Sequence, residues 1–257
     1  MPRKTEQRAK ARADGPRTLG ALTALPRKFY ERPILQVTRG LMGCLLVHER
    51  GKERLVGRIV EAEAYGGLVD AASHSFRGLT PRCRSMFGPR GHAYVYRIYG
   101  IHHCMNVAAG DPELAGAILL RAVEPIEGLK SMQERRAGRK PRELCRGPGR
   151  LSAAYGLDTA ADGLPLSRGS GLWIAPGPAI RGIRWTPRIG LGNNGAAHWL
   201  WRCVDPDSKY ASPTPQRWPR AARPRPAAAR PPPPAGRGES ACRRAGELDC
   251  RFPGGPP

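Results

Sequence analysis

The chain has 257 residues and a formal net charge of +22. This length suffices for one substantial hydrophobic core, and the charge is unlike that of an ordinary metabolic enzyme and favours a polyanionic partner, most simply nucleic acid. No apolar run approaches the ~20 residues of a membrane-spanning helix, and the charged N-terminus lacks the apolar region of a signal peptide, so we expect no membrane partner.

The first part of the chain predicts an arm, a helix and two strands. Residues 1–25 are polar and basic, and we expect them to form a disordered arm. The run 34-ILQVTRGLMGCLLV-47 predicts a short helix leading into a strand, and 54-RLVGRIVEAEAY-65 predicts the next strand. Residues 66–91 are rich in Gly, Pro and polar groups, and loops of that length are usually functional.

The second part predicts a β-hairpin, then helices and further strands. The strand 93-AYVYRIY-99 meets Gly100, and a second strand, 103-HCMNVAA-109, follows it. Pro148 suits the first turn of a helix. In chain order after the hairpin we expect a strand at 116–125, helices at 126–136 and 148–156, and strands around 171–175, 187–192 and 199–204.

Basic charge is spread along the whole chain. Residues 1–20 account for +4 and residues 213–257 for +6, which leaves +12 for residues 21–212. The last segment is mostly Pro, Ala and Arg, cannot bury enough apolar surface to offset its ordering entropy, and predicts a disordered tail. The tail is either an accessory nucleic-acid arm or without a role, and the basic folded part either contacts a polyanion or is simply solvated.

The seven cysteines suggest neither a zinc ribbon nor a disulfide framework. Their number is odd and no C-x-x-C pair occurs. The adjacent residues His102, His103 and Cys104 would point to opposite faces of a strand. We therefore expect reduced thiols, no metal and no cofactor, in the nucleoid-containing cytoplasm of a bacterium or the nucleus of a eukaryote.

Two acids lie within the apolar run 59-IVEAEAY-65. Because alternate residues of a strand share a face, we expect Ile59, Glu61, Glu63 and Tyr65 on one side and the small apolar residues between them against a core. Neighbouring carboxylates raise one another's pKa and can provide a general base. The alternative is an amphipathic strand with a solvated acidic face.

Aromatic and basic side chains are dense in 92-HAYVYRIYGIHHCMN-106. Tyr94 and Tyr96 alternate and should share a strand face. Tyr99 falls at the hairpin tip, where burial is difficult and where an aromatic side chain could act as a wedge between stacked bases. The competing explanation is the ordinary enrichment of Tyr in strands.

Four blocks in the middle of the chain carry a resemblance to a known family. They are 58-RIVEAEAYGGLVDAASHSFRGLTPR-82, 86-MFGPRGHAYVYRIYGIHHCMNV-107, 119-LLRAVEP-125 and 143-ELCRGPGRL-151, with weaker support from 187-PRIGL-191 and 201-WRCV-204. In this order they resemble the alkyladenine (3-methyladenine) DNA glycosylase family over roughly residues 30–212. Four separate blocks are far more specific than one short motif.

The resemblance implies a domain organisation and a fold. A DNA glycosylase domain would span residues 26–212, between the disordered basic segments 1–25 and 213–257. The fold would be mixed α/β: a single domain with a curved, mostly antiparallel β-sheet, peripheral helices and a protruding β-hairpin. The protein would act as a monomer on double-stranded DNA that contains a damaged purine.

The resemblance also implies an activity, namely a monofunctional glycosylase of base excision repair. It would remove 3-methyladenine, 7-methylguanine, hypoxanthine or ethenoadenine, in an order that the sequence does not fix, after flipping the base out of the duplex. Tyr99 matches the residue that intercalates in the vacated gap. The base-pocket positions match as follows: Tyr65 and Tyr96 sandwich the flipped base, His74 contacts the nucleotide, and Asn106 crowds the exocyclic amine of normal guanine.

For the chemistry, the resemblance implies that Glu63 is the general base and deprotonates a water that attacks C1′ of the deoxyribose. Arg121 matches a residue that helps to hold this water, while Glu61 has no matched role and is expected to be a solvated or structural neighbour. No Lys occurs between Lys52 and Lys130, so this region offers no amine for a Schiff base.

Three positions depart from the family pattern: Cys83 replaces an Asn, Arg97 replaces an apolar residue, and His102 lies at a variable hairpin position. None of them removes a proposed catalytic group. Two other classes of function stay open. One is a non-catalytic protein that binds damaged DNA, but such a protein would not need Glu63 to activate a water. The other is an RNA-binding protein, but a hairpin that wedges into duplex DNA disfavours it.

Overall fold

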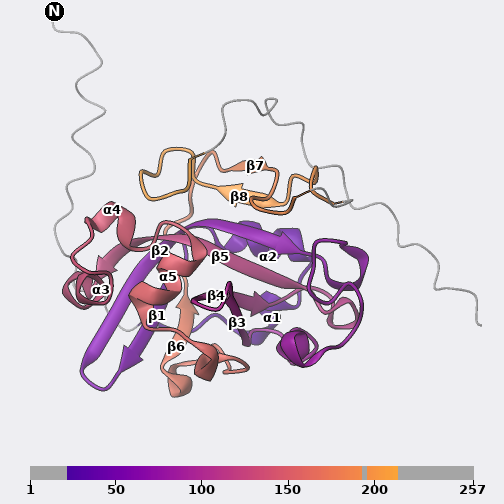
Figure 1. Ribbon diagram of the computed structural model, residues 1–257, viewed down its shortest axis with the longest axis horizontal. Coiled ribbons are helices and arrows are strands. Elements are labelled where there is room, and N and C mark those ends of the chain that lie inside the picture. Colours follow the sequence, from indigo (N-terminus) through magenta and orange to yellow (C-terminus); the bar gives the residue numbers. More distant parts are fainter. Residues whose placement is uncertain (1–21, 193–195, 214–257) are drawn as a thin grey trace, which may run out of the picture. The chain divides into compact units, whose positions relative to one another are not determined.

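The computed structural model describes residues 22–192 and 196–213, all of which fall within one compact unit. At its centre lies an eight-stranded sheet in which the paired strands run antiparallel. The sheet curls, and short helices lie at its periphery (Figure 1). The expected mixed α/β fold with a curved antiparallel sheet is confirmed.

The two longest strands, β2 and β5, form the middle of the sheet. The main strand order is β3-β4-β5-β2-β1-β6, and β8 pairs with both the C-terminal half of β2 and β7. The bounds are β1 (Leu45–Arg50), β2 (Glu53–Tyr65), β3 (Ala93–Ile98), β4 (His102–Ala108), β5 (Ala117–Glu127), β6 (Leu172–Ala175), β7 (Arg184–Thr186) and β8 (Arg202–Val204).

The helices are short and pack on the sheet through one apolar side. They are α1 (Arg27–Tyr30), α2 (Ile34–Leu41), α3 (Leu129–Arg135), α4 (Pro141–Leu144) and α5 (Pro148–Tyr155), and short 3₁₀ segments occur in the connections between elements. In α2, Val37 and Leu41 lie in the main core beside β2. As predicted, α5 begins at Pro148, and it ends at Gly156, which has the positive φ of 63° that a helix terminus favours.

A pair of β-bulges at the centre of the sheet places the two acids of β2. The register between β2 and β5 shifts on either side of Glu61, so Val60 and Arg121 lack partners directly opposite them. Ile59 and Ala62 therefore both face the main core, and the expectation that Ile59 shares a face with Glu61 is wrong. Bulges redirect side chains. Here the two register shifts accompany the turning of the Arg121 side chain of β5 toward Glu61 and Glu63 of β2.

The predicted strand at 187–192 is also wrong, because the sheet ends at Thr186 of β7 and the following residues form a loop. Gly190 and Gly192 have φ values of 81° and 59°, in the left-handed region that an extended strand does not use. The amide of Ile189 donates to a side chain, Glu63, rather than to a neighbouring strand.

The two terminal segments lie largely outside the described residues. Of the expected N-terminal arm, residues 22–25 are described, and they run beside β6: the amide of Leu25 donates to Ile174 O at 2.8 Å and the indole of Trp173 donates to Leu22 O at 3.1 Å. The expected tail lies outside the described residues beyond Pro213. Within the described part of the chain, no helix combines the length and apolar character needed to cross a bilayer.

Candidate active site

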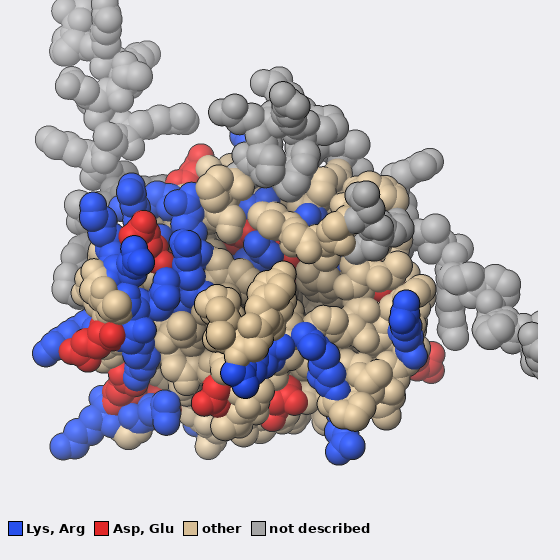
Figure 2. Space-filling view, viewed as in Figure 1, with Lys and Arg blue, Asp and Glu red and all other residues tan. Residues whose placement is uncertain are grey.

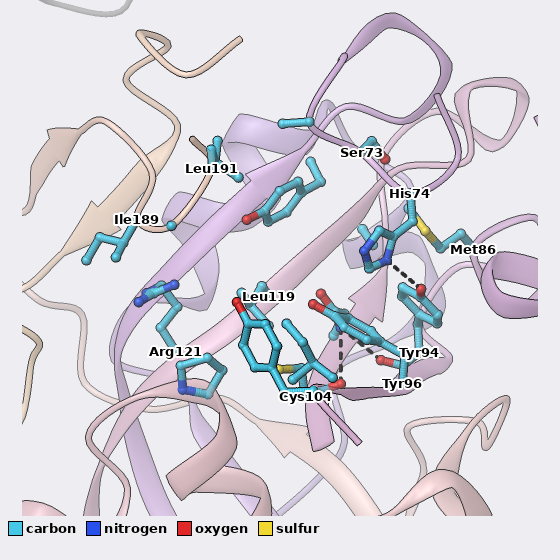
Figure 3. A pocket seen from close by; sticks show the side chains of 18 residues that line it. Ser73, His74, Met86, Tyr94, Tyr96, Cys104, Leu119, Arg121, Ile189 and Leu191 are labelled. Carbon is cyan, nitrogen blue, oxygen red and sulfur yellow. Dashed lines mark hydrogen bonds between the residues drawn. The ribbon is translucent and has the colours of Figure 1, made fainter. Parts of the chain in front are cut away.

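A pocket of about 320 Å³ opens between the end of β2, the β3–β4 hairpin, β5 and the loops at 66–91 and 187–192. It collects six of the seven residues singled out from the sequence: Tyr65, His74, Tyr96, Tyr99, Asn106 and Arg121. The other lining residues are Ala72, Ser73, Met86, Tyr94, Ile98, Cys104, Ala117, Leu119, Pro148, Ile189, Gly190 and Leu191. Arg121 and His74 lie on opposite sides of it (Figure 3).

Glu63, the seventh residue, is fully buried immediately behind this wall. Three lining residues donate hydrogen bonds to its carboxylate. The Tyr65 hydroxyl and Arg121 Nη1 reach Oε2 at 2.9 and 3.2 Å, and the backbone amide of Ile189 reaches Oε1 at 2.8 Å. A carboxylate oxygen offers two acceptor positions, and the Ile189 amide occupies one of those of Oε1.

Burial and the hydrogen-bond donors have opposite effects on the pKa of Glu63. Burial raises the pKa of Glu63 above its usual range, and this effect outweighs the opposing contributions of Arg121, the Ile189 amide and the Tyr65 hydroxyl. A raised pKa brings a carboxylate closer to the pH at which it works as a proton acceptor. The carboxylate is therefore suited to taking a proton inside the pocket.

Glu61, expected to be a solvated or structural neighbour, is fully buried and structural. Arg121 Nε and Arg202 Nε donate to its Oε1 at 2.8 and 2.7 Å, and the amide of Ser212 donates to Oε2 at 2.7 Å. Burial disfavours its charged form, but Arg202 and Arg121 outweigh that effect and hold the pKa of Glu61 below its usual range. Arg121 thus bridges Glu61 and Glu63 and is held in place by the first.

Aromatic rings give the pocket the shape of a slot for a flat molecule. The rings of Tyr94 and Tyr96 lie 5.3 Å apart on one face of β3, as their alternation predicts. His74 meets Tyr96 edge-on at 4.6 Å, and its Nδ1 is 2.8 Å from the Tyr94 hydroxyl (Figure 3). Burial and the nearby Arg82 lower the pKa of His74, so its imidazole is neutral at neutral pH.

Asn106 lies on the floor of the pocket in a fixed orientation. Its Nδ2 donates to the backbone oxygens of Tyr94 and Cys104 at 3.0 and 3.3 Å. Because Nδ2 uses its hydrogens in these two bonds, the side chain presents Oδ1 as an acceptor. Held at two points, the side chain cannot easily turn aside for a larger group on a pocket-bound ring.

Tyr99 lies at the tip of the β3–β4 hairpin with 84% of its surface exposed. Its φ is 53°, and Gly100 follows with 69°, as in a tight turn with two left-handed residues. A bulky side chain rarely adopts that conformation and carries a conformational cost there. Tyr99 thus combines an exposed ring at the mouth of the pocket with a backbone conformation that few bulky residues adopt.

The loop 187–192 is the part of the site that sequence reasoning placed incorrectly. It supplies Ile189, Gly190 and Leu191 to the pocket wall and one hydrogen bond to Glu63. Its only signals in the sequence were the short block 187-PRIGL-191 and the two glycines Gly190 and Gly192, two residues apart, which could have favoured a loop.

The three departures from the family pattern lie around the pocket without removing any of its side chains. Cys83 is fully buried, and its Sγ is 3.1 Å from the hydroxyl of Thr80 in the turn Pro81–Met86, so it has a structural role. Arg97 and His102 are exposed on the hairpin. The five described cysteines, Cys44, Cys83, Cys104, Cys145 and Cys203, are buried free thiols.

Within residues 22–192 and 196–213, no group of three or more His, Cys, Asp or Glu side chains is arranged to hold a metal ion. The residues around the pocket offer ring faces, fixed hydrogen-bonding groups and a buried carboxylate beside a guanidinium. Such an arrangement can bind a planar heterocycle and activate a water molecule next to it.

Comparison with known proteins connects this geometry to a family. A family model for methylpurine-DNA glycosylase (MPG) matches residues 28–209. Three similar curated proteins carry the name "Putative 3-methyladenine DNA glycosylase". The one from Methanocella arvoryzae is 42% identical over 193 residues, 74% of this chain and 96% of the relative.

The relative from Myxococcus xanthus is 45% identical over 194 residues, 74% of this chain and 94% of the relative. That from Methanoculleus marisnigri is 51% identical over 145 residues, 56% of this chain and 74% of the relative. The family match covers both the sheet and all the residues assigned to the pocket. The chain therefore belongs to the methylpurine-DNA glycosylase family and is an enzyme that acts on DNA.

Proposed function

We propose that this protein is a monofunctional DNA glycosylase that flips alkylated or deaminated purines, such as 3-methyladenine, 7-methylguanine, hypoxanthine and ethenoadenine, into the described pocket. It would hydrolyse the bond between the base and deoxyribose and leave an abasic site. The observation that carries this proposal is the buried carboxylate of Glu63 directly behind a slot lined by four tyrosines.

Flipping a purine out of the duplex costs unstacking and unpairing energy. In our proposal Tyr99 enters the gap left by the base, and the pocket offsets the cost by stacking the base between Tyr65 and Tyr96. Stacking of a base on an aromatic side chain contributes on the order of 1–3 kcal/mol. His74 would contact the flipped nucleotide. The fixed amide of Asn106 would then reject normal guanine by crowding its exocyclic amine.

The chemical step would use water as its nucleophile. Glu63 takes the proton of a water that attacks C1′, and its negative charge stabilises the oxocarbenium-like transition state. The guanidinium of Arg121, 3.2 Å from Glu63 Oε2, would hold the same water. None of the side chains that line the pocket is a lysine, in keeping with hydrolysis rather than a Schiff-base reaction.

Release of the free base tests this proposal directly. Duplexes that each carry one of the four lesions are incubated with the full-length protein, and liberated bases are identified by mass spectrometry against undamaged duplex. We expect a free purine from at least one lesion duplex and none from the control. Lesion-selective binding without base release would instead identify a non-catalytic reader of damaged DNA.

At the hairpin tip, we expect a substitution of Tyr99 to affect thermal stability and lesion excision differently. Replacing Tyr99 with Gly removes the ring and relieves the positive φ of 53°, so we expect unchanged or higher thermal stability but roughly tenfold or greater loss of lesion excision. Single-turnover excision and thermal melting measure the two effects. Tyr99→Phe, which keeps the ring, is the matched control; if Tyr99→Gly excises as fast as the parent, the wedge role is wrong.

Cations gather beside the pocket on α3, α4 and the start of α5 (Figure 2). We call this surface the basic ridge; its members are Lys130, Arg136, Arg139, Lys140, Arg142 and Arg150. Like-charge repulsion from Arg150 and Arg139 adds to burial in lowering the pKa of Arg136, so these charges lie close to one another. The ridge adjoins the pocket through Pro148, which begins α5 and lines the wall.

If the basic ridge contacts DNA phosphates, each contact adds about 0.9 to the slope of log K against log salt concentration. We expect Arg139→Gln/Arg142→Gln to reduce this slope by about 1–2 and to weaken binding to damaged and undamaged duplex alike. The matched control, Arg50→Gln/Lys52→Gln, removes the same charge at the β1–β2 turn, at the opposite end of β2 from Tyr65. Equal slopes for the two double variants would contradict the assignment.

A further inference from the structure

A buried ion pair outside the pocket wall connects three segments of the site. Arg188 and Asp70 have fully buried side chains. Arg188 Nη1 and Nη2 each donate to one carboxylate oxygen of Asp70, a two-point geometry that only a guanidinium provides. Neither residue lines the pocket.

The first segment is the end of β2, which carries Glu63 and Tyr65. Arg188 Nη1 donates to the backbone oxygen of Ala64, the residue between them, at 2.9 Å. The guanidinium also lies 4.7 Å from the centre of the Tyr65 ring. This contact sits behind the ring whose hydroxyl donates to Glu63, so Arg188 restrains both the backbone and the ring beside the carboxylate.

The second segment is the loop after β2. Asp70 accepts hydrogen bonds from the amides of Gly66 and Ala72 at 2.9 and 3.0 Å. Ala72 is followed by Ser73 and His74, and all three line the pocket. Asp70 therefore fixes the loop that places the imidazole.

The third segment is the loop of Arg188 itself. Ile189, its neighbour in sequence, gives the only backbone hydrogen bond to the carboxylate of Glu63 among the described residues. Arg188 Nη2 additionally donates to the backbone oxygen of Ala196 at 3.2 Å. Arg188 thus makes four hydrogen bonds through Nη1 and Nη2, and the residue that follows it supplies the amide that donates to Oε1 of Glu63.

We propose that the Arg188–Asp70 pair is a positioning device that holds the Ile189 amide against the carboxylate of Glu63. The inference rests on the proposed function of Glu63 as the base. The charged and titratable groups around Glu63 are Glu61 and Tyr65 on β2, Arg121 on β5 and Arg202 on β8, its partner in register. Of the donors to the Glu63 carboxylate, Arg188 restrains two: the Ile189 amide, through the backbone that follows it, and the Tyr65 hydroxyl, through contact with its ring.

The expected effect is a shift in the pH profile. The Ile189 amide lowers the pKa of Glu63 against the effect of burial, so misplacing it raises that pKa further. Because the base must be ionised, the acid limb of the kcat/KM profile should move to higher pH. We expect a shift of about one pH unit, equivalent to roughly tenfold lower kcat/KM on the acid side.

The experiment measures hypoxanthine excision from a duplex between pH 4.5 and 8.5 with the full chain and two variants. Arg188→Lys keeps a charge opposite Asp70 but loses the two-point geometry, and Asp70→Asn keeps the shape but loses the charge. Tyr65→Phe removes another hydrogen bond to Glu63 and should shift the limb in the same direction. Arg58→Lys is the matched control, because Arg58 pairs with Glu124 on the same two central strands but not at the pocket.

The positioning role is supported if the acid limb of the kcat/KM profile moves to higher pH in both Arg188→Lys and Asp70→Asn but not in Arg58→Lys. A limb that stays in place while melting temperature falls shows that the pair is structural only and overturns the inference. Failure of the parent to release any of the four bases would instead overturn the proposed function, irrespective of the pair.

Discussion

Replacing Glu63 with Gln is expected to slow excision of hypoxanthine from duplex DNA by about 10²–10⁴-fold, the usual contribution of a positioned general base. The amide has the shape of the carboxylate and can still accept from the Ile189 amide, but it cannot take a proton from water. Burial makes the ionised form of Glu63 costly, so we expect the variant to be no less thermally stable than the parent.

Single-turnover kinetics and lesion-binding measurements on the same preparations separate the chemical step from recognition. We expect binding of the hypoxanthine duplex to stay within about threefold, because Glu63 has no exposed surface and touches the pocket only through neighbouring side chains. A comparable loss of binding would show that the substitution disturbs the slot rather than the base, and would leave the catalytic assignment unsupported.

Replacing Glu61 with Gln is expected to cost about 3–5 kcal/mol in the free energy of unfolding, because it leaves a buried charge without its counter-charge. That charge is Arg202, which is fully buried and pairs with Glu61 at 2.7 Å. Arg121 would also lose its shorter ion pair, at 2.8 Å, and keep the one to Glu63 at 3.2 Å. We therefore expect excision to fall as well, through a misplaced Arg121.

Urea unfolding at several pH values measures this effect. Because the pKa of Glu61 is lowered in the folded state, its stabilisation is present above the unfolded pKa of about 4.3 and is lost as pH falls through the folded pKa. The difference between parent and variant should shrink accordingly in acid. Glu53→Gln, which breaks a more exposed pair with Arg135, should cost about 0–1 kcal/mol; an equal cost for both would contradict the buried-network account.

Local patterns in the sequence predicted much of the sheet. The run 54–65 became β2 because its apolar residues suit a strand buried on both faces, and the Tyr-rich hairpin formed around Gly100 because glycine accepts a positive φ there. Pro148 and Gly156 bound α5 for equally local reasons. Such signals depend on neighbouring residues alone.

The rest depends on contacts between distant segments. The burial of Glu61 requires Arg202, which lies 141 residues away in sequence. The bulges that turn Arg121 toward Glu61 and Glu63 depend on how β2 pairs with β5. The alternation of apolar and polar residues in the sequence does not predict them. Likewise, residues 187–192 have a strand-like composition, but the amide of Ile189 donates its hydrogen bond to the Glu63 carboxylate rather than to a neighbouring strand.

Detection of abasic sites tests the role of Glu63 as the general base. A duplex with a single end-labelled hypoxanthine strand is incubated with the parent or Glu63→Gln, and half of each sample is then treated with hot alkali, which cuts DNA at abasic sites. We expect strand cleavage by the parent only after alkali, and almost none by Glu63→Gln even though it binds the duplex. Cleavage without alkali, or equal cleavage by both proteins, would contradict a water-using glycosylase with Glu63 as its base.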